Sequence, residues 1–414
     1  MRKIQSLQTL RFIAISLVFL SHCTFIAHPQ GGALFNMAGA FGVSLFICLS
    51  GFLTYYAASA RKQPTIAEQR APRGATAEHA RPACPARMPL KAHAGTFFRK
   101  VGKFYPLHVI TFVAAIPLVV AAVAGSANAL DQVWIGALNL ALLQSWVPNS
   151  QVFFSFNAVS WYLSTFLLMI ALSPALVGLA KRVGATGRFG SSMRGRAGML
   201  GSGAAPEPRG RGIALAALLI AAIFAIELAA ALVLADSPVG QWVLYVFPPM
   251  RLLDYFAGML CGVMFAELAR RPRPSSRAMV LLGGVAGAVL AAAGIAYAAR
   301  HGLQTPMLFY SAAWVVPSNL LILSFATFDE AAPLRARLLV FLGGISMEFF
   351  LIHQLVLRYA KLWFDTAAQP LLFAAACYLI AWLLAYAAHR AFAGGRKRSE
   401  AKSLRQHAPH ERER

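Results

Sequence analysis

The stretch TLRFIAISLVFLSHCTFIA, residues 9–27, has the length and composition of a helix that crosses a membrane. About 20 apolar residues are needed to span the hydrocarbon core of a bilayer, because an α-helix rises only about 1.5 Å per residue. Nine further apolar segments are long enough to span, at residues 36–58, 104–124, 159–180, 213–235, 248–268, 278–298, 308–327, 338–359 and 370–393. The sequence therefore predicts an all-α, polytopic membrane bundle of about ten transmembrane helices.

The composition agrees with this prediction and excludes an ordinary soluble domain. Of the 414 residues, 58% are hydrophobic and 13% are charged, whereas soluble domains have about 45–50% apolar and about 25% charged residues. A further apolar run at residues 132–147 is interrupted by polar side chains. It is too short for a regular span, and we interpret it as an interfacial or re-entrant helix.

The chain is strongly basic, with 38 Lys and Arg against 15 Asp and Glu and a net charge of +23. Of the 38 basic residues, 32 fall in residues 1–8, 59–103, 181–212, 269–277, 328–337 and 394–414. If the ten segments span and residues 132–147 do not, all of these basic regions lie on one side of the membrane. The positive-inside rule then predicts that both termini are cytoplasmic. Nucleic acid is not an expected partner, because these loops carry few aromatics and lie on a membrane surface.

The predicted organisation is one membrane domain, residues 1–393, followed by a basic cytoplasmic tail, residues 394–414. Two inserts, near residues 59–98 and 182–212, are rich in Pro, Gly, Ala, Arg and Ser, and this composition predicts disordered cytoplasmic loops. The five cysteines show no metal-ligand spacing, so we predict no metal site. The bilayer is the expected environment, and the sequence does not indicate an oligomeric state.

Ionisable residues inside a membrane span are candidates for function, and the first span contains Arg11 and His22. Eleven residues correspond to about three helical turns, so both side chains lie on one stripe, roughly 16 Å apart along the axis. This spacing suits an anionic ligand held at the cytoplasmic end with its reactive tip at the histidine. Alternatively, Arg11 contacts lipid phosphates and His22 is a hydrogen-bonded packing residue.

The segment LRFIAISLVFLSH (residues 10–22), followed by GVSLFICLSGFL (residues 42–53), resembles the opening of the acyltransferase family 3 membrane proteins. The resemblance continues, in family order, at FFRKVGKFYPLHVI (97–110), NLALLQSWVP (139–148), SWYLSTFLL (160–168), FPPMRLLDYFAGMLCG (247–262) and LGGISMEFFLIHQLV (342–356). It implies a bacterial inner-membrane enzyme that takes an acyl group, often acetyl, from cytoplasmic acyl-CoA. The implied acceptor is a hydroxyl of a carbohydrate, a lipid-linked glycan or a macrolide.

The resemblance also assigns roles to residues. His22 corresponds to the catalytic residue, and Arg11 is implied to bind the anionic donor or to organise its tunnel. The family's pair of cytoplasmic arginines corresponds to Lys100 and Lys103, with Arg99 adjacent, and these are implied to bind the CoA phosphates. A neutral imidazole can accept a proton from an attacking hydroxyl. Direct transfer and an acyl-histidine intermediate are both compatible with these residues.

Four further residues are weaker candidates for an acceptor pocket or for a structural role. Arg251 and Asp254 are three positions apart, so they can pair along one helix face. Trp161 stands at the outer end of a span, where aromatic residues are common. His353 matches a histidine of the family, although a structural role is also compatible with its position.

A different function class is also compatible with buried charges in a membrane bundle. A permease or flippase for a small molecule or lipid-linked sugar could use them as a substrate path. Release of CoA thiol distinguishes an acyltransferase from such a transporter.

Overall fold

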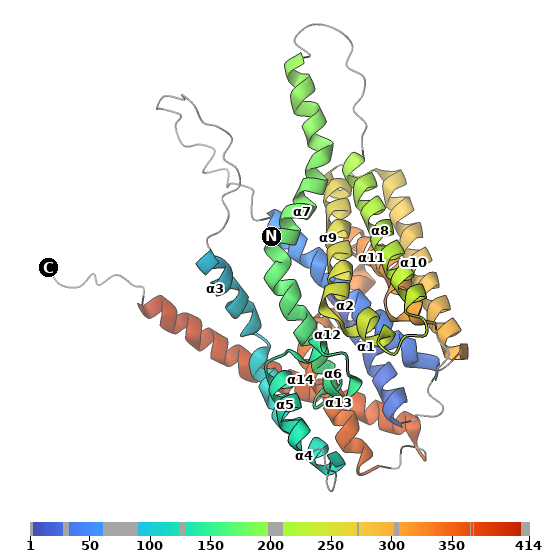
Figure 1. The fold of residues 1–414 in the computed structure, drawn as a ribbon. Coiled ribbons are helices and arrows are strands. Elements are labelled where there is room, and N and C mark those ends of the chain that lie inside the picture. Colours follow the sequence, from blue (N-terminus) through green and yellow to red (C-terminus); the bar gives the residue numbers. More distant parts are fainter. Residues whose placement is uncertain are drawn as a thin grey trace, which may run out of the picture.

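The structure of this protein is a computed structural model that describes residues 3–27, 33–60, 90–123, 129–197, 210–270, 273–301, 306–364, 366 and 368–406. Within these ranges the chain forms helices and contains no strand (Figure 1). The α-helices are α1 (Ser6–Ala27), α2 (Ala33–Ala60), α3 (Leu90–Val101), α4 (Tyr105–Val123), α5 (Ala129–Leu140), α6 (Ser150–Phe153), α7 (Trp161–Ala197), α8 (Arg211–Val233), α9 (Pro248–Arg270), α10 (Pro274–His301), α11 (Ala312–Thr327), α12 (Arg337–Gly344), α13 (Ser346–Lys361) and α14 (Pro370–Gln406). Short 3-10 or π turns form η2 (Gln144–Trp146), η3 (Ala158–Ser160), η4 (Trp242–Val246), η6 (Met307–Tyr310) and η7 (Ala332–Arg335).

The membrane-spanning helices lie where the sequence predicts them. Eight described helices are long and apolar enough to cross a bilayer: α1, α2, α4, α7, α8, α9, α10 and α14. Helices α12 and α13 together are also long and apolar enough, although the chain bends by 72° between them. The shorter apolar helix α11 coincides with the predicted segment at 308–327. The predicted fold class, an all-helical polytopic bundle, is confirmed.

Parts of the regions predicted as disordered inserts are helical where the structure describes them. Residues 90–98 belong to α3 and residues 182–197 continue α7, whereas residues 61–89 and 198–209 lie outside the described residues. Helix α3 is amphipathic, because Phe97 and Val101 pack against the core while Arg99 is exposed. A composition averaged over the whole insert hides such a short periodic pattern. The first part of the predicted tail, residues 394–406, likewise continues α14.

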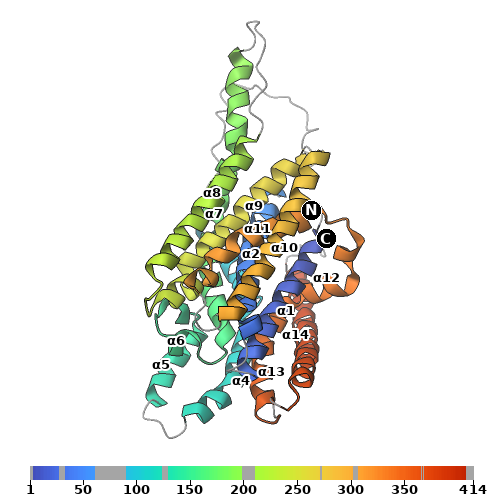
Figure 2. The same ribbon diagram turned by 90° about the vertical axis from the view of Figure 1, so that its right-hand side faces the viewer.

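Helix α2 is the most buried of the spans and forms the centre of the bundle. Within the protein, 78% of its spanning window is buried, compared with 17% for α8 and 22% for α10. Helices α8 and α10 lie at the outer edge in Figure 1, whereas α13 and α14 lie beside α1 in Figure 2.

Two glycines bring α2 and α9 into close contact. A Cβ atom at Gly51 would lie 1.9 Å from the carbonyl oxygen of Tyr255, and one at Gly258 would lie 1.8 Å from the carbonyl oxygen of Cys48. No side chain fits into these spaces, so the two backbones touch directly, as is common where membrane helices pack through small residues.

The bend between α12 and α13 directs α13 along α1. Gly343, near the end of α12, lies so close to α1 that a Cβ atom there would be 1.8 Å from the carbonyl oxygen of Gln8. After the bend, α13 packs against α1 further along its length. This arrangement brings residues of α13 opposite His22.

Candidate active site

Two histidines from distant parts of the sequence meet inside the bundle. Nδ1 of His22, on α1, lies 2.8 Å from Nε2 of His353, on α13. The ring centroids are 5.1 Å apart and the ring planes are inclined by 24°. The sequence predicts His22 as the catalytic residue and His353 as a weaker candidate, but it does not predict that they are in contact. The structure places both in one site.

The second nitrogen of His353 fixes the direction of this hydrogen bond. Nδ1 of His353 lies 3.1 Å from the carbonyl oxygen of Phe349, one helical turn earlier. A carbonyl oxygen only accepts, so Nδ1 of a neutral His353 donates and its Nε2 accepts from Nδ1 of His22. Nε2 of His22 then carries a lone pair, and it makes no hydrogen bond to another side chain or carbonyl in the described part of the chain.

Aromatic rings surround His353 and remove it from solvent. The ring of Phe349 stacks on that of His353, with the centroids 5.5 Å apart and the planes inclined by 3°. The centroid of the Phe19 ring lies 6.3 Å from that of His353. His353 is fully buried, whereas His22 is only partly buried. Of the two rings, only that of His22 therefore keeps exposed surface.

Arg11 lines a pocket of about 120 Å³ between α1, α2, α7 and the α12–α13 bend. Its guanidinium donates to the side-chain oxygen of Gln8 at 3.3 Å. Phe350 also lines this pocket, and its ring centroid lies 6.0 Å from that of His353. The other lining residues are Val43, Phe46, Ser50, Tyr162, Phe166, Gly344, Ser346 and Met347. A single aromatic side chain thus connects the Arg11 pocket with the histidine pair.

The predicted donor-binding cations lie at the junction of α3 and α4. Arg99 and Lys100 are in the last turn of α3, and Lys103 is in the turn that follows. The next residue, Phe104, is buried, and its ring lies 6.0 Å from that of Phe166 in the wall of the Arg11 pocket. The aromatic contact therefore attaches the basic turn to the outside of this pocket.

Arg251 and Asp254 form a fully buried ion pair with an N–O distance of 2.8 Å. Arg251 also donates to Oγ of Ser44 on α2 at 2.8 Å. Its Nη1 lies 3.5 Å from the carbonyl oxygens of Leu244 and Tyr310. The pairing predicted from the spacing is present, and neither residue lines the Arg11 pocket.

Glu227 is a further intramembrane carboxylate that sequence reasoning missed. It lies on α8, is fully buried and interacts electrostatically with Asp254 and Arg251. Its position in an otherwise apolar span was a visible signal, since such residues are rare and costly in a membrane.

Trp161 begins α7 and supports neighbouring turns. Its ring lies 4.8 Å from that of Tyr245, and its carbonyl oxygen accepts from Oγ of Ser145 at 2.8 Å. Burial raises the pKa of Tyr245, which lies between the spans, to about 12, so this hydroxyl stays protonated at neutral pH. Trp161 is itself buried and does not line the Arg11 pocket.

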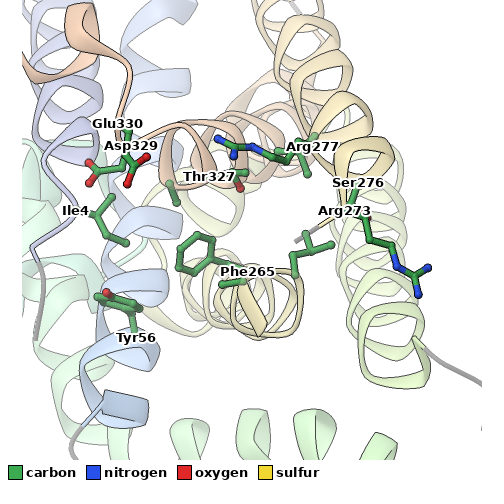
Figure 3. A pocket seen from close by; sticks show the side chains of 13 residues that line it. Ile4, Tyr56, Phe265, Arg273, Ser276, Arg277, Thr327, Asp329 and Glu330 are labelled. Carbon is green, nitrogen blue, oxygen red and sulfur yellow. The ribbon is translucent and has the colours of Figure 1, made fainter. Parts of the chain in front are cut away.

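A second pocket, of about 250 Å³, lies at the ends of α9 and α11 and the beginnings of α1 and α10 (Figure 3). Arg277, Asp329 and Phe265 are among the residues that line it. None of the predicted site residues lines this pocket. Among the described residues, no group of three or more His, Cys, Asp or Glu side chains is placed to hold a metal ion.

Comparison with known proteins identifies the family. Residues 4–390 match the family described as "Acyltransferase domain". The chain is also similar to the acyltransferase MdmB of Streptomyces mycarofaciens, with 26% identity over 373 residues that cover 86% of this chain and 80% of that protein. No solved structure matches the chain significantly. Because the family match covers nearly the whole chain, the protein belongs to acyltransferase family 3 and is an acyltransferase built from membrane-spanning helices.

Proposed function

We propose that this protein is an O-acyltransferase of the bacterial inner membrane. It transfers an acyl group, with acetyl as the expected group, from cytoplasmic acyl-CoA to a hydroxyl of a glycan or lipid-linked acceptor. The observation that carries the proposal is the chain of hydrogen bonds from the Phe349 carbonyl through His353 to His22. These hydrogen bonds leave Nε2 of His22 unprotonated on a partly exposed ring, and this supports a role as general base.

In the proposed reaction, the acceptor hydroxyl oxygen attacks the thioester carbonyl carbon while Nε2 of His22 takes the hydroxyl proton. The C–O bond forms, the C–S bond breaks, and the proton passes from Nε2 to the leaving CoA sulfur. His353 holds His22 in the required tautomer and orientation, as a buried carboxylate does in a serine-protease triad. His353 is thus a positioning residue in this mechanism.

The donor would enter at the basic turn between α3 and α4. Arg99, Lys100 and Lys103 would attract the CoA phosphates, and Arg11 would hold an anionic group deeper in the pocket. Two observations support this path: Arg11 lines the pocket, and the aromatic contact of Phe104 with Phe166 joins the basic turn to it. The distance of roughly 16 Å along α1 from Arg11 to His22 requires an extended donor.

Three of the weaker candidates lie outside the Arg11 pocket. Arg251 and Asp254 form a buried ion pair and do not line the Arg11 pocket, and Trp161 packs against Tyr245. We therefore assign these three residues to the support of the outer turns and not to acceptor binding.

The decisive experiment measures CoA thiol release by the purified protein in nanodiscs, given acetyl-CoA with and without candidate glycan and lipid-linked acceptors. The proposal expects acceptor-dependent thiol release that is lost in His22→Ala. Substrate movement into proteoliposomes without thiol release would instead support the permease or flippase. Mass spectrometry of surface glycans and lipids from cells with and without the gene identifies the acceptor and the acyl group.

A further inference from the structure

A charged cluster inside the membrane takes no part in the proposed reaction. It consists of Arg251 and Asp254 on α9 and Glu227 on α8, and all three side chains are fully buried. Nη1 of Arg251 lies 2.8 Å from Oδ2 of Asp254, and Glu227 interacts electrostatically with both residues. From the other neighbouring elements, Cys48 on α2 and Ser311 before α11 face Glu227.

The charges of this cluster do not cancel if both acids are ionised. Two carboxylates and one guanidinium leave one net negative charge, and an isolated buried charge in a low-dielectric environment is strongly unfavourable. Within the described structure, Glu227 forms no ion pair, and the hydroxyl of the fully buried Ser311 lies beside its carboxylate. The cluster therefore needs one additional positive charge.

The arrangement favours a proton over a metal ion as the source of this charge. Arg251 already neutralises Asp254 and is anchored to Ser44, so a metal cation beside Asp254 would face the guanidinium. Hard cations also need about six oxygen ligands, whereas a proton needs only one carboxylate. We propose that the Glu227–Asp254–Arg251 cluster is a buried proton-binding site, in which Asp254 is paired with Arg251, Glu227 holds one proton and the cluster is neutral.

If the cluster is always neutral, the number of protons that it binds equals its number of carboxylates minus its number of guanidinium groups. Variants that change either number test this rule. The native cluster holds one proton. Glu227→Gln and Asp254→Asn each hold none, because the remaining acid pairs with Arg251. Arg251→Gln holds two, because both remaining acids must be neutral.

Infrared spectroscopy of the full-length protein in an ester-free detergent measures these protons, because the C=O band of a carboxylic acid is separate from the carboxylate bands and shifts in D2O. We expect the acid band in the native protein, its loss in Glu227→Gln and in Asp254→Asn, and about a twofold increase in Arg251→Gln. Asp236→Asn, which changes an exposed acid between α8 and α9, is the matched control and keeps the band.

A second measurement does not depend on whether Arg251→Gln folds. Glu227→Gln is the neutral analogue of the protonated acid and needs no proton uptake on folding, so its Tm should match the native Tm in acid, where glutamate is also protonated in the unfolded chain, and exceed it at neutral pH. The native Tm should decrease more steeply with rising pH than that of Glu227→Gln, because the folded native protein binds the extra proton. Absence of the acid band in the native protein would overturn the proposal, and so would its persistence in both single acid variants. The proposal would also fail if the band appeared only when sodium is replaced by choline, because a sodium ion would then supply the positive charge.

Discussion

Nδ1 of His22 and Nε2 of His353 lie 2.8 Å apart, although 331 positions separate these residues in the sequence. The contact joins the first span to the helix after the α12–α13 bend, so the geometry of the site depends on that bend. The two rings also differ in exposure: His22 is partly exposed, while His353 is buried among aromatic side chains.

Replacement of the proposed base tests the mechanism directly. We expect His22→Ala to lower kcat by about 10²- to 10⁴-fold, the usual contribution of a positioned general base. The variant should insert and elute as a single species like the native protein, which size-exclusion chromatography in detergent checks. Native turnover by a folded His22→Ala protein would contradict the assignment.

His353 should affect turnover without affecting donor binding. We expect His353→Ala to lower kcat while the KM for acyl-CoA stays close to native, since His353 does not line the Arg11 pocket. His353→Gln should retain more activity than His353→Ala, because a glutamine oxygen can still accept the hydrogen bond from Nδ1 of His22. If His353 serves only in packing, His353→Ala and His353→Gln should have equal activity when their Tm values are equal.

Arg11 should act on the donor. Arg11→Ala is expected to raise the KM for acyl-CoA more than it lowers kcat, and Arg11→Lys to recover part of the loss, because lysine keeps the charge but not the planar fork. The control is Arg277→Ala, which removes a guanidinium from the other pocket. Equal effects of Arg11→Ala and Arg277→Ala on KM would argue against a specific donor site.

The basic turn before α4 should contribute through charge. We expect the double variant Lys100→Ala/Lys103→Ala to raise the KM for acyl-CoA and to weaken its dependence on ionic strength, because screening acts on exposed charges. Lys100→Arg/Lys103→Arg should lower KM, since guanidinium groups bind phosphates in a bidentate way. Arg182→Ala, at an exposed position of α7, serves as a control with unchanged KM.

The contact between α2 and α9 should be sensitive to a single methyl group. Gly258→Ala would place a Cβ atom 1.8 Å from a backbone oxygen, and we expect a loss of at least about 1–3 kcal/mol of stability, the usual effect of overpacking. Gly178→Ala on α7 is the matched control, because no atom lies within 4 Å of its added Cβ. It should leave Tm unchanged or raise it slightly, since alanine favours a helix over glycine.

The sequence predicts the spans because their length, apolarity and flanking charge are local properties, and Arg11 and His22 follow from the same local reasoning. The contact of His22 with His353 is different, because it depends on how α13 packs on α1 after a bend that composition does not reveal. The helical segment at residues 90–98 was missed for a related reason: its amphipathic pattern is short and lies within a polar insert. Glu227 was the opposite case, since its presence in the sequence is plain and only its partners required the structure.

The direct backbone contact of α2 with α9 also bears on how the protein responds to its lipid environment. Membranes differ in hydrophobic thickness, and helices adjust to a mismatch mainly by changing tilt. Helices α8 and α10 expose most of their surface and can tilt, whereas α2 is enclosed by its neighbours. We therefore expect lipids of different chain length to change the tilt of the peripheral helices and to leave the α2–α9 pair unchanged. Bilayer thickness should thus affect the outer helices of the bundle more than its centre.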